Sequence, residues 1–146
     1  MWKERIIETD RGIFEVFEKG KGEPLAVTHL YSEFNQKGNL MAAPFTDYYH
    51  VYLINLRGAG KSVKANEIEE YSMSETVKDL EAIRKALHHE KWAFAGHSTG
   101  GMLALKYAID YPTSLTKIIA GGAAASKEYV KDKNSIYCKK NPHYNR

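Results

Sequence analysis

Cysteine and long apolar runs are scarce in this chain. Cys138 is the only cysteine among 146 residues, so no disulfide can form within the chain, which is typical of a reducing compartment. No apolar stretch reaches the roughly 20 residues that a membrane-spanning helix needs. The start of the chain, Met1 to Arg5, carries charges, but no long apolar stretch follows it as in a signal peptide. We therefore expect a cytoplasmic protein that does not contact a membrane.

A strong charge of either sign is also missing. The formal net charge is only +3, which gives no indication of a nucleic-acid partner. A hydrophobic content of 43% is enough for one globular domain with a real core. The basic residues gather in positions 126–146, which hold six Lys or Arg against two acidic residues. We expect a core over residues 1–125 and a solvated basic tail over 126–146; the alternative for the tail is a patch for an acidic partner.

Strand and helix patterns alternate along the core. Residues 5–9 and 13–19 read as two strands with a hairpin turn at Asp10, Arg11 and Gly12. Further strands are predicted at 25–29, 51–56, 92–95 and 116–120. Helices are predicted at 36–43, from the capping box at Ser72 to about 88, and at 101–109. This order predicts an α/β fold with a doubly wound, mostly parallel sheet of about six strands and helices on both faces.

The most informative motif is Gly-His-Ser-Thr-Gly at residues 96–100, followed by Gly101. It stands between a predicted strand and a predicted helix, which is the setting of a nucleophile elbow with Ser98 as the nucleophile. Gly96, Gly100 and Gly101 would let strand and helix pack closely around a strained turn, with Ser98 at positive φ. The alternative is an ordinary serine in a tight turn.

The elbow also predicts an anion site. The helix that starts after Ser98 would direct the N–H of Thr99 toward the place where negative charge develops. The loop after strand 25–29 supplies the second donor in this architecture. His29, at the end of that strand, stands at the wrong place in the chain for the base and is expected to shape the loop; the alternative is a histidine with no role in the site.

A serine nucleophile needs a base and an acid, which follow it in the order acid and then histidine. Most residues after Ser98 are taken up by the predicted helix and strand. Asp132 and His143 stand in the right order, but their separation is too short to hold the strands that usually present them. The sequence therefore predicts a nucleophile without a convincing triad.

A second glycine-rich run, Arg-Gly-Ala-Gly-Lys-Ser at residues 57–62, resembles the end of a phosphate-binding loop. The first glycine of that motif would fall at position 55, which is Asn55, and residues 63–70 lack a helical apolar period. Phosphate binding is therefore disfavoured. No pair of histidines has metal-ligand spacing, so we expect neither a metal nor a cofactor.

Four stretches together resemble the N-terminal half of an α/β-hydrolase of the proline iminopeptidase and carboxylesterase type. They are the strand ending at His29, the run Asn-Leu-Arg-Gly-Ala-Gly-Lys-Ser at 55–62, the elbow at 96–101 with its helix, and the apolar strand at 118–120. Leu30 replaces the family's usual glycine, and Asn55 replaces its usual aspartate. The resemblance implies that Ser98 is the nucleophile, that His97 belongs to the elbow, and that Thr99 with Leu30 or Tyr31 gives the oxyanion N–H groups.

The resemblance further implies hydrolysis of a small-molecule ester or amide through an acyl-Ser98 intermediate. The family's acid and histidine lie on later strands and have no counterpart here, and the cap that selects the substrate would begin near Ser126. We expect weak or no activity from this chain alone. The alternative is a non-catalytic scaffold that self-associates, through the edge strand 116–120, or binds a complementary chain.

Overall fold

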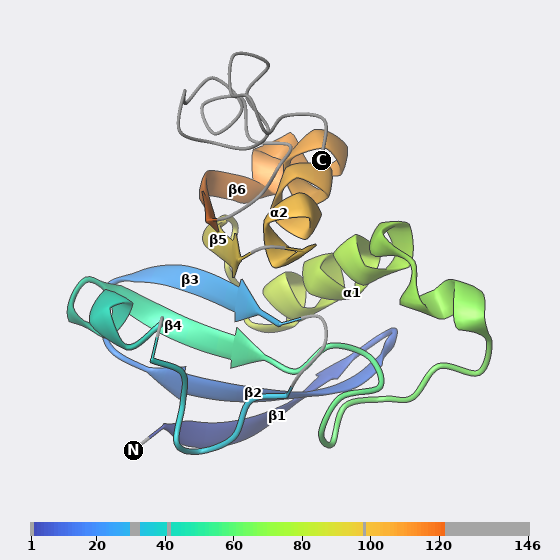
Figure 1. The fold of residues 1–146 in the computed structure, drawn as a ribbon, viewed down its shortest axis with the longest axis horizontal. Coiled ribbons are helices and arrows are strands. Elements are labelled where there is room, and N and C mark those ends of the chain that lie inside the picture. Colours follow the sequence, from blue (N-terminus) through green and yellow to red (C-terminus); the bar gives the residue numbers. More distant parts are fainter. Residues whose placement is uncertain (1, 30–32, 41, 98, 122–146) are drawn as a thin grey trace, which may run out of the picture.

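The computed structural model describes residues 2–29, 33–40, 42–97 and 99–121. Six strands form one sheet in the order β1-β2-β4-β3-β5-β6 (Figure 1). Three of its five pairings are parallel, while β1–β2 and β2–β4 are antiparallel. The strands are β1 (Lys3–Thr9), β2 (Gly12–Lys19), β3 (Glu23–Thr28), β4 (Tyr49–Ile54), β5 (Trp92–His97) and β6 (Leu115–Gly121). The mostly parallel α/β sheet predicted from the sequence is confirmed; the tail at 126–146 lies outside the described residues.

In the described residues, two α-helices and three short 3₁₀ helices connect these strands. The α-helices are α1 (Met73–Ala86) and α2 (Thr99–Asp110), and the 3₁₀ helices are η1 (Ala43–Asp47), η2 (Ile68–Tyr71) and η3 (Pro112–Ser114). Figure 1 shows α1 and α2 on the same side of the sheet. They pack there against one core cluster, which includes Phe14, Val16, Ile54, Phe94, Leu80, Ile83, Leu103 and Tyr107.

The opposite face of the sheet is also buried. Along β4, Val51 and Leu53 face this side while Tyr52 and Ile54 face the helices. A second cluster forms here from Trp2, Phe17, Leu25, Phe34, Val51, Leu53 and Ala93, with Phe45 of η1 packed against it. The strand β4, within the apolar run at 51–56, is therefore covered on both faces, as parallel strands usually are. The second cover is loop and 3₁₀ helix in the described residues, rather than the α-helix expected from the sequence.

The helix predicted at 36–43 is wrong. Short polar side chains close turns there: Asn35 Oδ1 accepts from the N–H of Lys37 at 2.8 Å, and Asn39 Oδ1 accepts from the N–H of Ala42 at 3.1 Å. Gly38 lies between them with φ of 80°. Asparagine competes with a helix through such local bonds. The helical turn begins only at η1, where Pro44 stands in the first turn instead of ending a helix.

The start of α1 follows the predicted cap. The Ser72 hydroxyl accepts from the N–H of Glu75 at 3.2 Å. The Glu75 carboxylate does not return to the backbone of Ser72 but contacts Arg11 at 3.2 Å and Lys78 at 2.9 Å. The helix ends at Ala86, two residues before the predicted end. Ser72 therefore caps α1 as predicted, whereas Glu75 forms ion pairs, one of which connects α1 to Arg11 of the hairpin turn.

Candidate active site

The Gly-x-Ser-x-Gly motif lies where a strand gives way to a helix. β5 ends at His97 and α2 begins at Thr99, so a single residue, Ser98, separates the two elements. Gly96 and His97 pair with Ala120 and Gly121 of β6. The strand–turn–helix setting expected of an elbow is therefore present. Ser98 itself lies outside the described residues, and its positive φ stays a prediction.

The helix after the motif packs closely on the sheet. Leu103, Ala104 and Tyr107 are fully buried in the helix-side core, and Gly101 is buried in the first turn. The ring of Tyr107 stands edge-on to Phe94 of β5, with centroids 5.3 Å apart and planes at 77°. Small residues in the first two turns thus bring α2 against β5, as the sequence indicated.

The second predicted anion-binding segment follows β3. Thr28, the last residue of that strand, pairs with Ile54 of β4, and the exposed ring of His29 stands edge-on to Phe34 at 6.3 Å. Leu30 and Tyr31, the candidates for oxyanion donors, lie outside the described residues. The structure describes the segment again from Glu33 onward.

Asn55, directly after β4, binds the far end of this segment. Its Oδ1 accepts from the N–H of Phe34 at 2.6 Å, and its Nδ2 donates to the carbonyl of Phe34 at 3.1 Å. The second Nδ2 proton goes to Glu15 Oε1 at 2.9 Å. All three residues are buried. The sequence showed only that asparagine stands where aspartate is usual; the partners, 40 and 21 residues away, carried no signal.

The loop after Asn55 is bound to β2. The Ser62 hydroxyl donates to the carbonyl of Asn55 at 2.6 Å and accepts from the N–H of Glu15 at 2.9 Å. The N–H of Lys61 donates to Glu15 Oε1 at 3.1 Å, and that of Gly60 to Glu33 Oε2 at 2.7 Å. Carboxylates therefore occupy two N–H groups that a phosphate would need. This agrees with the sequence interpretation, which disfavoured phosphate binding.

Gly60 meets two requirements in this loop. Its φ is +50°, and a Cβ there would overlap Glu15 Oε1 and Asn55 Nδ2. Any side chain at position 60 would push the loop off the Asn55–Glu15 pair, so a glycine is needed.

Arg57 fixes the loop from the other side. Its guanidinium donates to both carboxylate oxygens of buried Asp79 on α1, at 3.0 and 2.9 Å, and to the carbonyl of Arg11 at 3.0 Å. Arg11 donates to the same carboxylate at 2.7 Å. The hydrogen bonds from Arg57 to Asp79 raise the pKa of Arg57 above its usual value, despite partial burial. The hairpin turn, this loop and α1 therefore meet at one carboxylate.

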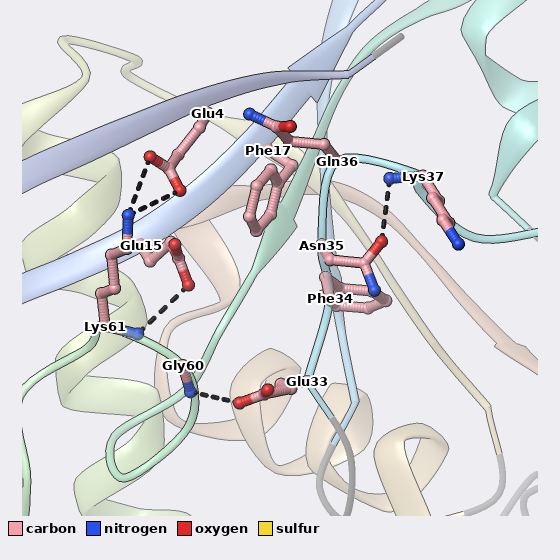
Figure 2. Close-up of a pocket in the computed structure, with 10 residues that line it drawn as sticks. All are labelled: Glu4, Glu15, Phe17, Glu33, Phe34, Asn35, Gln36, Lys37, Gly60 and Lys61. Atoms are coloured by element: carbon pink, nitrogen blue, oxygen red, sulfur yellow. Dashed lines mark hydrogen bonds and ion pairs between the residues drawn. The ribbon is translucent and has the colours of Figure 1, made fainter.

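A cleft of about 620 Å³ opens beside these groups, between the β1–β2 hairpin, residues 33–37 and the Gly60–Lys61 turn (Figure 2). Its size is within the range of small-molecule sites. The three carboxylates in its wall already have partners: Glu4 pairs with Lys61 Nζ at 3.2 Å, Glu15 binds the Lys61 N–H, and Glu33 binds the Gly60 N–H. Neither Gly96 nor Gly101 lines it.

Within the described ranges, no three His, Cys, Asp or Glu side chains gather as a metal ion would require. Of the helices built from those residues, none is both long enough and apolar enough to span a membrane.

Comparison with known proteins agrees with the geometry. Residues 27–136 match the family described as alpha/beta hydrolase fold, and this chain belongs to that family. A solved alpha/beta fold family hydrolase from Bacillus anthracis str. Sterne is 64% identical, with a TM-score of 0.85, over 100% of this chain and 52% of its own. The resemblance stated from the sequence motifs is confirmed.

Two curated relatives illustrate the range of activities in the family. A proline iminopeptidase from Chitinophaga pinensis is 29% identical over 93% of this chain and 48% of its own length. Epoxide hydrolase 1 from Caenorhabditis elegans is 28% identical over 81% of this chain and 30% of its own. The chain thus spans less than half the length of either relative.

Proposed function

We propose that this chain carries the nucleophile and the oxyanion site of a serine hydrolase that cleaves a small-molecule ester or amide through an acyl-Ser98 intermediate. The observation that carries the proposal is the one-residue junction between β5 and α2, with Ser98 at that junction. A helix N-terminus directly after the nucleophile favours the negative charge of a tetrahedral intermediate.

The residue types in the motif favour acyl transfer. Residues 96–101 contain the hydroxyls of Ser98 and Thr99 but no carboxylate, and a serine hydroxyl attacks an acyl carbon once a base accepts its proton. This is closer to the chemistry in the name of the proline iminopeptidase relatives than to epoxide opening. Because no acid and histidine stand at the expected places, the proposed activity of the 146-residue chain by itself is weak or absent.

Covalent capture of Ser98 tests the proposal. A fluorophosphonate probe, followed by intact mass, should label the chain slowly or not at all, and added imidazole should accelerate labelling by acting as the missing base. Ser98→Ala should abolish that labelling, whereas Ser74→Ala, an exposed serine on α1, should not. No Ser98-dependent labelling even with imidazole would reject the nucleophile. Fast labelling without imidazole would reject the weak-activity proposal and make His143 the first candidate base.

One observation supports the second function, that of a self-associating scaffold. β6 is the terminal strand of the described sheet and pairs only with β5. A strand with an unpaired edge is a template for another strand, and two copies can meet about a twofold axis. We propose that this edge supports a homo-oligomer, with Ile118 and Ile119 near the contact.

A further inference from the structure

The corner between α1 and β5, formed by residues 88–90, is a tight reversal of the chain. His88 has a φ of 63°, in the left-handed region that costs energy for residues other than glycine. The N–H groups of His88 and His89 donate to the carbonyls of Lys85 and Arg84, at 3.0 and 3.2 Å. Arg84 Nη1 in turn donates to the carbonyls of His89 and Glu90, both at 2.8 Å. Hydrogen bonds therefore hold the corner in a conformation that its backbone does not favour by itself.

The side chain of His89 connects this corner to the sheet. Its Nε2 lies 2.9 Å from the hydroxyl of Tyr52 on β4. Tyr52 is 3% exposed, and its hydroxyl has no other hydrogen-bond partner among the described residues. A neutral imidazole with Nε2 unprotonated accepts the phenol proton, whereas an imidazolium has only donors. Protonation of His89 would therefore leave the buried proton of the hydroxyl without an acceptor, which costs free energy.

A second histidine contacts the same tyrosine. The ring of His50 stacks on that of Tyr52, with centroids 4.4 Å apart and planes at 17°. His50 Nε2 lies 3.4 Å from the carboxylate of Glu18, which also pairs with Arg5 at 3.3 Å. A proton on His50 would therefore have a carboxylate partner. A proton on His89 would have none among the described residues.

We propose that the contact between His89 and Tyr52 is a pH-sensitive switch. Neutral His89 holds the corner on the sheet; protonated His89 leaves Tyr52, and the corner opens into water while the sheet stays folded. Histidine suits this role because its charge changes near physiological pH. The switch does not depend on the reactivity of Ser98.

The charges around His89 favour release once it is protonated. The positive groups nearby are Arg5 on β1, His50 on β4, His88 in the corner and Arg84 at the end of α1. Burial, followed by the charges of His50, Arg5 and His88, lowers the pKa of His89. The carboxylate of Glu18 on β2 does not compensate, because Arg5 and His50 already bind it. Opening also relieves the left-handed backbone of His88.

Amide hydrogen exchange of the 146-residue chain at pH 7.5 and pH 5.5 tests the switch. Rates are expressed as protection factors, which removes the pH dependence of the intrinsic exchange rate. Protection of the amides at positions 88 and 89 should fall about three- to tenfold on acidification, because a released histidine with a pKa of about 6.5 limits the change to about tenfold at pH 5.5.

The amide of Leu53, on β4 between β2 and β3, distinguishes local opening from global unfolding. At pH 5.5 the corner amides should be about tenfold or more less protected than the Leu53 amide, because the corner opens without the sheet. Corner protection that does not change with pH would overturn the proposal. So would corner protection equal to that of Leu53, because the corner would then open only when the whole chain unfolds.

His89→Gln separates the switch from other effects of acid. Glutamine keeps an acceptor for Tyr52 but does not titrate, so corner protection should be the same at both pH values. His88→Asn is the matched control; it removes the neighbouring histidine, suits the left-handed conformation, and should retain the acid-induced loss. A loss in His89→Gln equal to that of the wild type, or no loss in His88→Asn, would overturn the proposal.

Tyr52→Phe tests the other partner at neutral pH. Without the hydroxyl, neutral His89 has no hydrogen bond to β4, so corner protection at pH 7.5 should fall about threefold or more. Tyr49→Phe, on the same strand, removes a hydroxyl that accepts from Lys117 at 3.2 Å and should leave corner protection unchanged. Equal corner protection in Tyr52→Phe and in the wild type would overturn the proposal.

Discussion

The phenol of Tyr107 donates a 2.6 Å hydrogen bond to the carboxylate of Glu81, which joins α2 to α1 inside the core. The same carboxylate accepts from Arg84 and from Ser114 of η3, and the Trp92 indole of β5 donates to Tyr107 at 3.0 Å. Burial alone would raise the pKa of Glu81, but the hydrogen bonds outweigh it, and the pKa lies below its ordinary value. One charged group thus links four elements beneath the strand that leads to Ser98.

Removing the Tyr107 hydroxyl should therefore destabilise the fold. We expect Tyr107→Phe to lower the free energy of unfolding by about 1–3 kcal/mol, because Trp92 and the buried carboxylate each lose a partner. Tyr111→Phe is the matched control; it removes a hydroxyl from a half-buried ring that contacts Tyr107, and should change the value by about 0.5 kcal/mol or less. Urea unfolding at pH 7 measures both. Equal losses of unfolding free energy in the two variants would show that the Tyr107 hydroxyl stabilises the fold no more than the Tyr111 hydroxyl does.

Acid should weaken the fold through His89. Its ring nitrogen Nε2 lies 2.9 Å from the hydroxyl of Tyr52, and burial, followed by the charges of His50, Arg5 and His88, lowers its pKa. The folded state therefore favours the neutral ring. The contribution of His89 is complete above the unfolded pKa of about 6.5, and it is lost as the pH falls through the lower folded value.

Urea unfolding between pH 8 and pH 5 measures this dependence. His89→Gln, which keeps an acceptor for Tyr52 but does not titrate, should flatten the decline in unfolding free energy below about pH 6.5. A variant with the same slope as the wild type would contradict the assignment to His89.

Thr28 offers a gain in stability. Its buried hydroxyl has no hydrogen-bond partner in the part of the chain that the structure describes. Thr28→Val replaces it with an isosteric apolar group, so the free energy of unfolding should rise by about 1 kcal/mol. In the matched variant Thr76→Val, the lost hydroxyl donates to the Ser72 carbonyl at 2.9 Å, and the free energy should fall by a similar amount. A loss of stability in Thr28→Val would reveal a partner for that hydroxyl.

Self-association through β6 is tested by light scattering at micromolar concentration. The chain should give a mass above that of the monomer, and Ile118→Lys or Ile119→Lys should return it to the monomer mass, because a lysine along an edge strand opposes pairing. Circular dichroism checks that each variant remains folded. A monomeric wild type would remove this proposal.

The strands were predictable because their signal is local. The run at 51–56 is apolar on both faces, and β4 occupies that place; the Ser72 cap was visible three residues from its partner. The helix expected at 36–43 is absent for one local and one tertiary reason. Asn35 and Asn39 close local turns around Gly38. The backbone N–H of Trp2 donates to the carbonyl of Gln36 at 3.2 Å, a long-range contact that the local pattern did not predict.

The candidate site, like the fold, was predictable where its signal is local and not where it depends on distant residues. The Gly-x-Ser-x-Gly spacing placed Ser98 between a strand and a helix, and the structure has both elements there. The hydrogen bonds between Asn55 and Phe34 were not predictable, because they depend on three buried residues from three separate segments. A departure from a family motif, asparagine for aspartate, marked the position without giving its partners.

Hydrogen bonds fix the backbone of the loop over residues 57–63 at several points. The N–H of Gly58 donates to the Val63 carbonyl at 2.8 Å, and the N–H of Val63 donates to Ile13 at 2.9 Å. With Ser62 also bound to Asn55, one inserted residue would break at least one of these bonds. An insertion should be tolerated better at Lys64 and Ala65, which are exposed or half-buried and precede the N–H groups of Asn66 and Glu67 that bind Glu70. A tag or cleavage site placed there would leave these hydrogen bonds intact, whereas one placed four residues earlier would not.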